Sequence, residues 1–406
     1  MFSRSSQVVV ACVASRFGAA VFFPLLQQQL DRSVEFSTPV TSYRSLQEGV
    51  FLAQRELPVY DGGVVHQAPL LVAAMAWVSG ETLRALAYAC VDAMIAHQLM
   101  VAARVLRKRA GGVSAAGIPA NAALPQPWIV GALYVLNPLV LLSTLSRSTL
   151  VFTHLAVATA AVAAVQGRSA WAGAGVAAAA YLSLYPLLLV VPIAAILPNK
   201  RCATVCTAAC IATLLLLLVS SYRVSHDSWQ YVYSTYGVVA TFGKLVPNLG
   251  LWWYFFVELF EMFVPFFKAV FNLFVVACIL PFSLRFYKQP FYAFVLCIAW
   301  IALTKPYPTL GDAGFVLSFL PFFQPLFGYF RYSVVTALLL VHAIVLSPIF
   351  YHLWVDLGSG NSNFFYAISL VYALALASML VDLVWAMLRT EYDAGKPNLT
   401  LKMTPV

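Results

Sequence analysis

The chain has 406 residues, of which 62% are hydrophobic and only 10% are charged, and its formal net charge is +9 at pH 7. Soluble domains carry roughly a quarter charged residues, so this composition excludes an ordinary soluble protein and predicts one membrane domain over residues 1–406. The basic residues lie in short clusters between apolar runs, which argues against a nucleic-acid partner and favours a role in membrane topology.

The apolar runs predict an all-α polytopic membrane protein with about twelve transmembrane helices. In chain order the predicted spans are 7–30, 82–103, 128–146, 149–166, 169–183, 185–198, 203–221, 266–285, 290–304, 312–329, 332–350 and 364–388. The apolar run 68–79 is too short to cross and is expected to lie in the interface or re-enter. Basic clusters at 104–109, 198–201 and 285–288 fall on one side, which predicts that this side and both termini are cytosolic.

Three polar segments fall on the opposite, luminal side. They are a first luminal loop at 31–67, a second luminal segment at 222–265, and a last luminal loop at 351–363. The first loop is rich in acids, and the alternative to a functional site there is a folded loop with surface ion pairs.

The second luminal segment leads into an aromatic stretch, PNLGLWWYFFVELFEMFVPFF, at 247–267. Nine of its 21 residues are aromatic, and such rings prefer the boundary between membrane and water. We expect an interfacial helix in which Glu258 and Glu261, three residues apart, share one face beside a lipid-like partner. The alternative is a helix that only anchors the protein.

The sequence contains no recognisable motif for catalysis, for a cofactor or for a metal. The seven cysteines include no C-x-x-C pair, and no nucleophile triad, phosphate loop, dinucleotide fingerprint or zinc pattern is present. We therefore predict no catalytic residues, no cofactor and no metal. Cys202, Cys206 and Cys210 are spaced four apart and are expected to help helices pack, with a metal site or palmitoylation as alternatives.

Several blocks resemble the PIG-U family, the multi-span subunit of the glycosylphosphatidylinositol (GPI) transamidase complex. PNLGLWWYFFVELFEMF resembles the family's signature region, and KPYPTLGD at 305–312 and HLWVDLGSGNSNFFYAISL at 352–370 are similar to later blocks. Less specific likenesses lie, in the same order, at 60–71, 136–149 and 181–192. The loop at 104–127 departs from the family in being shorter and richer in Ala and Gly, which puts the cytosolic contacts in doubt.

The resemblance implies a non-catalytic subunit in the endoplasmic reticulum membrane. It implies that the chain binds the GPI lipid and presents it for attachment to the C-terminus of proproteins. The implied partners are a caspase-like cysteine protease subunit and further membrane subunits, and the implied fold resembles the GT-C glycosyltransferase membrane fold.

Luminal elements 247–258, 305–312 and 352–366 are expected to converge if neighbouring spans pack together. The predicted GPI-binding or lipid-binding residues are Asn248, Trp252, Trp253, Tyr254, Glu258, Asn361, Asn363, Phe364 and Tyr366. Amides suit sugar hydroxyls, carboxylates suit the glucosamine ammonium, and aromatic rings suit sugars and acyl chains. The alternatives are turn formation for the two late asparagines, ion pairing for Glu258, and a loop salt bridge between Lys305 and Asp312.

Two other functions remain open from the residues. A GT-C type mannosyltransferase that uses a dolichol-phosphate sugar would need Glu35 or Asp61 as an essential base, although neither belongs to an adjacent acidic pair. A transporter or lipid flippase would use Asp92 and His97 inside a span, although their spacing of five places them on different faces.

Overall fold

The computed structural model describes residues 3–110, 124–242 and 244–393, and every regular element in these ranges is a helix. In chain order these are α1 (Arg4–Phe22), α2 (Pro24–Arg32), α3 (Tyr43–Gln54), α4 (Pro69–Ala76), α5 (Glu81–Ala110), α6 (Pro127–Leu136), α7 (Pro138–Leu145), α8 (Leu150–Gln166), α9 (Ser169–Leu182), η1 (Tyr185–Leu189), α10 (Val190–Ile196), α11 (Lys200–Val224), α12 (Gln230–Val232), η2 (Tyr233–Gly237), α13 (Val238–Ala240), α14 (Trp253–Glu258), η3 (Glu261–Phe263), α15 (Val264–Ala277), α16 (Ile279–Arg285), α17 (Pro290–Thr304), α18 (Leu310–Leu317), η4 (Leu320–Tyr329), α19 (Ser333–Tyr351), η5 (His352–Asp356) and α20 (Ser362–Tyr392).

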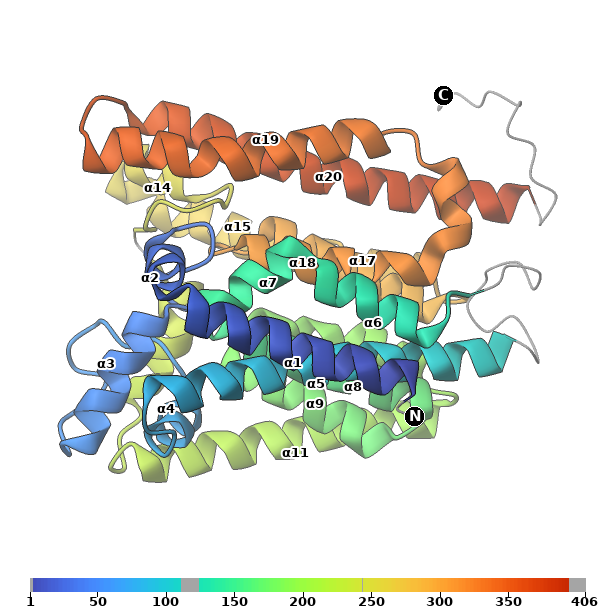
Figure 1. Cartoon of the computed structure of the whole chain (residues 1–406), viewed down its shortest axis with the longest axis horizontal. Helices are drawn as coiled ribbons and strands as arrows, with labels where there is room; N and C mark the ends of the chain where they lie inside the picture. Colours follow the sequence, from blue (N-terminus) through green and yellow to red (C-terminus); the bar gives the residue numbers. More distant parts are fainter. Residues whose placement is uncertain (1–2, 111–123, 243, 394–406) are drawn as a thin grey trace.

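The long helices lie side by side along one axis (Figure 1). The start of α1 and the end of α20 are at the same end of this bundle, and α2, α3, α4 and α14 gather at the other end. The predicted loop at 104–127 begins inside α5, which continues to Ala110. Residues 111–123 of that loop, and the end of the predicted cytosolic tail at 394–406, lie outside the described residues.

Six helices of the described chain are long and apolar enough to cross a membrane, or eight if each of two bent pairs counts as one span. The polytopic, all-helical class is therefore confirmed. Four further apolar helices have only 10–17 residues, and a full crossing takes about 20, so the count of twelve stays a prediction.

Prolines interrupt the predicted spans. The predicted span 7–30 divides into α1 and α2 at Pro24, and the span 128–146 divides into α6 and α7, bent by 59° at Asn137-Pro138. The axes of α18 and η4 are bent by 76° relative to each other, and Pro321 is the second residue of η4. Proline lacks the amide that the preceding turn needs and disfavours helical geometry in the residue before it, so these bends have a local cause.

Small residues let α9 approach α8 and α11 closely. A Cβ at Gly173 of α9 would lie 2.1 Å from the backbone oxygen of Cys206 in α11, and one at Gly175 would lie 2.9 Å from the Ala160 backbone in α8. Cys206 and Cys210 are buried at the first of these crossings, which confirms that these two cysteines serve packing.

A buried ion pair connects α1 to α5. The Arg16 Nε lies 2.7 Å from Asp92 Oδ2, and the side chains are 2% and 0% exposed. Tyr134 of α6 donates its hydroxyl to the other Asp92 oxygen, and Arg16 Nη1 donates to the Val135 carbonyl at 2.7 Å. His97 is exposed elsewhere on α5. Asp92 and His97, the two groups that the transporter hypothesis needs, therefore do not come together.

Candidate functional site

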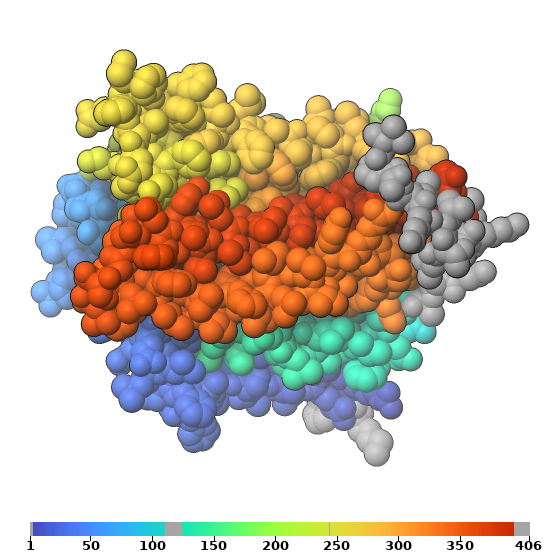
Figure 2. Space-filling model, turned by 90° about the horizontal axis from the view of Figure 1, so that it is seen from above, coloured from blue at the N-terminus to red at the C-terminus, as the bar shows by residue number. Residues whose placement is uncertain are grey.

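Aromatic rings from three segments meet at the end of the bundle that carries α14. Trp253 is fully buried, and its ring centroid lies 5.9 Å from that of Trp354, 5.7 Å from that of Phe365 and 5.7 Å from that of Tyr366. In Figure 2 the yellow segment that contains α14 packs along the red and orange α19–α20 pair. The expected convergence of 247–258 and 352–366 is present, and we call this contact the aromatic junction.

Polar contacts fix the aromatic junction at its surface. Tyr254 stacks on Tyr366 with ring centroids 4.5 Å apart, and its hydroxyl donates to Asn363 Oδ1 in the first turn of α20. The Tyr366 hydroxyl donates to the Leu251 carbonyl at 3.2 Å. Aromatic stacking and side-chain hydrogen bonds thus hold α14 against the start of α20 in one register.

The third expected element, 305–312, lies directly against the turn before α14. A Cβ at Gly250 would lie 2.9 Å from the Pro306 carbonyl oxygen, so only glycine fits there. The Val246 amide donates to the Tyr307 hydroxyl at 3.3 Å. Burial raises the pKa of this tyrosine, so the phenol stays protonated as part of the packed turn.

Three of the predicted contact residues are buried and support the aromatic junction from inside the molecule. Asn248 is 1% exposed, and its amide donates to the Val246 carbonyl and accepts from the Gly250 amide. Trp252 is 7% exposed and donates its indole N–H to the Thr304 carbonyl. Asn248, Trp252 and Trp253 therefore form the buried part of the site.

The remaining predicted residues are accessible. Asn361 is exposed and caps α20, because its Oδ1 accepts from the amides of Asn363 at 3.0 Å and Phe364 at 3.4 Å. The turn interpretation of Asn361 is therefore confirmed, and the cap leaves its Nδ2 group available. Phe364 is 55% exposed and Glu258 is exposed at the end of α14.

One detail of the aromatic stretch was predicted wrongly. The helix ends at Glu258, because Leu259 is extended with ψ 134°, and Glu261 begins a separate 3-10 turn. The two glutamates therefore do not share the face of one continuous helix.

The sequence matches the family model of the GPI transamidase subunit PIG-U over residues 10–372. The chain belongs to the PIG-U family. It is 52% identical over 408 residues, covering 100% of both chains, to a Saccharomyces cerevisiae protein named GPI transamidase component GAB1. It is 30% identical to a Schizosaccharomyces pombe GAB1 homolog, with 92% of each chain covered, and 28% identical to the human GPI-anchor transamidase component PIGU, with 95% and 94% covered.

The mannosyltransferase alternative receives no support from these PIG-U relatives. Glu35 is 3% exposed and accepts hydrogen bonds from the hydroxyls of Ser33 and Ser347, whereas Asp61 is exposed. Glu35 thereby joins the first loop to α19, which explains its burial without a catalytic role.

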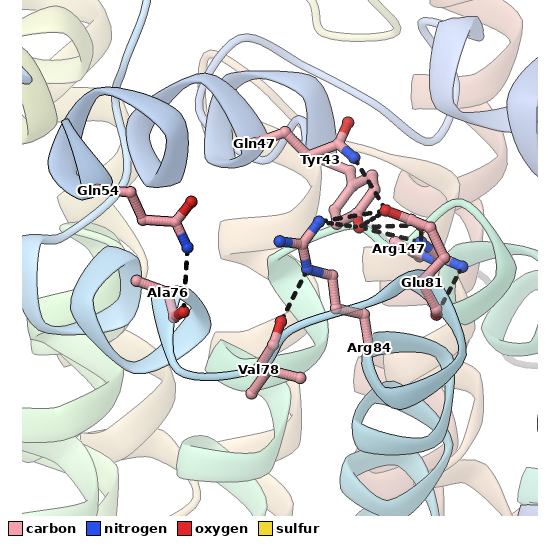
Figure 3. A network of polar contacts seen from close by, with 8 residues as sticks. All are labelled: Tyr43, Gln47, Gln54, Ala76, Val78, Glu81, Arg84 and Arg147. Atoms are coloured by element: carbon pink, nitrogen blue, oxygen red, sulfur yellow. Dashed lines mark hydrogen bonds and ion pairs between the residues drawn. The ribbon is translucent and has the colours of Figure 1, made fainter.

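Ion pairs also lie at the first loop of this PIG-U chain, but one partner in each, Asp31 or Arg147, is buried and so these are not pairs at the surface. Arg147, in the turn between α7 and α8, pairs with Glu81 at the start of α5 and donates to the Tyr43 hydroxyl of α3 at 2.9 Å (Figure 3). Arg44 lies 3.1 Å from Asp31, and burial raises the pKa of this aspartate although the guanidinium opposes the shift.

A buried polar cluster lies deeper in the molecule. The expected salt bridge between Lys305 and Asp312 is present at 2.7 Å, with both side chains about nine-tenths buried. His154 of α8 approaches the same carboxylate at 3.7 Å and stacks on Phe315 with centroids 4.1 Å apart. The sequence analysis did not predict that His154 joins this cluster, because no local signal connects it to Lys305 and Asp312.

Proposed function

We propose that the chain is a non-catalytic membrane subunit of GPI transamidase in the endoplasmic reticulum. The observation that carries this proposal is membership of the PIG-U family over residues 10–372, together with relatives over the whole chain that are named as transamidase components. Its partners are the other subunits, including a caspase-like cysteine protease subunit that performs the chemistry.

The accessible side of the aromatic junction is where the chain would present the GPI lipid. The side chains proposed to contact it are Tyr254, Glu258, Asn361, Asn363, Phe364 and Tyr366, and Asn248, Trp252 and Trp253 hold them in place. Amide donors suit the sugar hydroxyls and phosphates, the carboxylate suits the glucosamine ammonium, and the exposed Phe364 ring suits an acyl chain.

The proposed topology has both termini in the cytosol and twelve crossings in a GT-C-like arrangement. Twelve crossings require both bent pairs and all four shorter apolar helices to span. The common end of α1 and α20 supports an even number of crossings. The aromatic junction, at the opposite end, is then luminal, where proproteins meet the transamidase.

The substitution Asn361→Asp tests the lipid contact without breaking the helix. Aspartate caps a helix as well as asparagine does, but it replaces the amide donor with a carboxylate. Asn199→Asp is the matched control, because Asn199 is an exposed cap of α11, with Oδ1 accepting from the Cys202 amide at 2.8 Å.

In cells whose only copy carries Asn361→Asp, we expect reduced GPI attachment to proproteins and accumulation of complete GPI precursor at normal protein level. The control variant should behave as the parent. Accumulation of a truncated glycolipid instead would contradict the transamidase role, and full attachment in Asn361→Asp would remove this residue from the lipid site.

A further inference from the structure

The outward face of α19 carries a histidine in the middle of a membrane-spanning helix. α19 and the short helix η5 together form one of the six segments that are long and apolar enough to cross a membrane. His342 is exposed, and each end of α19 is nine residues away from it, about 14 Å along the helix axis. The imidazole therefore lies near the centre of a hydrocarbon core about 30 Å thick, too deep to reach water by snorkelling.

One nitrogen of this imidazole has its hydrogen bond inside α19, and the other has none. Nδ1 lies 2.7 Å from the Leu338 carbonyl oxygen, which can only accept, so Nδ1 carries the proton. Nε2 is then a bare acceptor, and no donor among the described residues meets it. Lipid tails supply no donor and the hydrocarbon core holds no water, so an unmet acceptor there costs free energy. Ionisable side chains inside spans accordingly almost always face protein or a water-filled cavity.

The surroundings of His342 on the outward face of α19 are apolar. The large exposed side chains there are Leu338, Val341, Val345 and Ile349. With 3.6 residues per turn, these four and His342 fall within about 100° of the helix circumference, which is the width of the stripe that a helix packs against a neighbour. The other side of α19 is already used, because Thr336 Oγ1 lies 2.7 Å from Ser378 Oγ of α20. In Figure 2 the orange α19 lies along the visible surface of the molecule.

We propose that this face of α19 binds a transmembrane helix of another subunit, and that this helix donates a hydrogen bond to His342 Nε2. The occupant is apolar, to match the stripe, and carries one donor side chain at mid-membrane depth, such as serine, threonine, asparagine or glutamine. A lipid tail fits the stripe but cannot meet Nε2, and a water-soluble segment does not reach this depth. The inference rests on the proposed role as a subunit of a membrane complex, and it adds the face of the chain that one partner helix meets.

A photo-activated cross-linker tests whether a helix covers this face. p-Benzoylphenylalanine is placed at Val345, one turn from His342, in the tagged full-length chain, and native membranes are irradiated before the complex is solubilised and purified. We expect mass spectrometry to locate the cross-link in a transmembrane segment of another transamidase subunit, within one turn of a donor side chain. An adduct with lipid alone, with a second copy of this chain or with a water-soluble segment would overturn the proposal.

The substitution His342→Leu tests the hydrogen bond itself. Leucine is more favourable than histidine against lipid, so a face covered by lipid predicts an unchanged or more stable protein. A partner helix that donates to Nε2 predicts the opposite sign. We expect the partner subunit to leave the immobilised complex at a lower detergent concentration, with its affinity reduced about threefold, the value of one hydrogen bond between membrane helices.

Two further variants separate the hydrogen bond from a change of shape or polarity. His342→Gln keeps an acceptor at this position and should retain the partner better than His342→Leu does. Thr207→Val is the matched control on α11, another candidate span. Thr207 is also exposed, but its hydroxyl donates to the Ala203 carbonyl at 3.1 Å within the helix and needs no partner, so this variant should retain the partner as the parent does.

The results distinguish failure of this inference from failure of the proposed function. Equal retention of the partner in the parent and in His342→Leu would overturn the hydrogen bond to His342, and the subunit role would stand as long as transamidase subunits accompany the chain. Purification of the cross-linked chain without any transamidase subunit would overturn both.

Discussion

The buried ion pair between Arg16 and Asp92 predicts that the contact between α1 and α5 contributes strongly to the free energy of unfolding. Replacing Asp92 with Ala leaves a guanidinium that is 2% exposed without its counter-charge. Breaking a buried pair in this way typically costs about 3–5 kcal/mol, because the remaining charge stays desolvated. Replacing Arg16 with Met should cost less, since Tyr134 still donates to the Asp92 carboxylate.

The double variant Arg16→Met, Asp92→Leu removes both charges and keeps most of the buried volume. Because apolar replacement of a buried ion pair is often neutral, we expect it to recover most of the loss seen in Asp92→Ala. Unfolding of the purified protein, followed by cysteine exposure, is measured for the parent, Arg16→Met, Asp92→Leu and the double variant, which form the four corners of the cycle, and Cys12 lies beside Asp92 as a local reporter. A loss below about 1 kcal/mol for Asp92→Ala would refute this reasoning, since it would mean that the guanidinium finds water or another partner.

Gly173→Ala should destabilise the protein by about 1–3 kcal/mol, because the new Cβ meets the Cys206 carbonyl oxygen, whereas Gly62→Ala, with open space around it, should be neutral in the same unfolding assay. An unchanged midpoint for Gly173→Ala would show that α9 and α11 separate easily. Glu35→Gln should keep GPI attachment in cells wherever the protein accumulates normally, because its role is to accept hydrogen bonds from two serine hydroxyls. Loss of attachment at normal protein level would instead assign chemistry to that carboxylate.

Helix positions could be predicted well because apolar runs and their flanking prolines and charges are local signals. The predicted span 290–304 coincides with α17, and 149–166 and 169–183 differ from α8 and α9 by one residue at one end. The bends were not predicted, although Pro138 and Pro321 are local signals for them in the sequence. The early end of α14 at Glu258 has no proline or glycine beside it that could serve as a local signal.

The site could be predicted at the level of segments and only partly at the level of residues. The segments 247–258, 305–312 and 352–366 were predicted to lie on the same side of the membrane, and this was enough to expect that they converge. Which side chains face inward depends on packing, so Asn248 and Trp253 could not be told apart from the accessible Tyr254 and Asn361. The hydrogen bond from Ser347 to Glu35 depends on a contact across most of the chain, where sequence spacing carries no information.

The central claim is tested most directly by affinity purification of the tagged chain in a mild detergent, with mass spectrometry of the proteins and lipids that accompany it. The account predicts a caspase-like cysteine protease subunit, further membrane subunits and GPI in the purified material. Recovery of the chain alone, or with glycosyltransferases and no protease subunit, would contradict it.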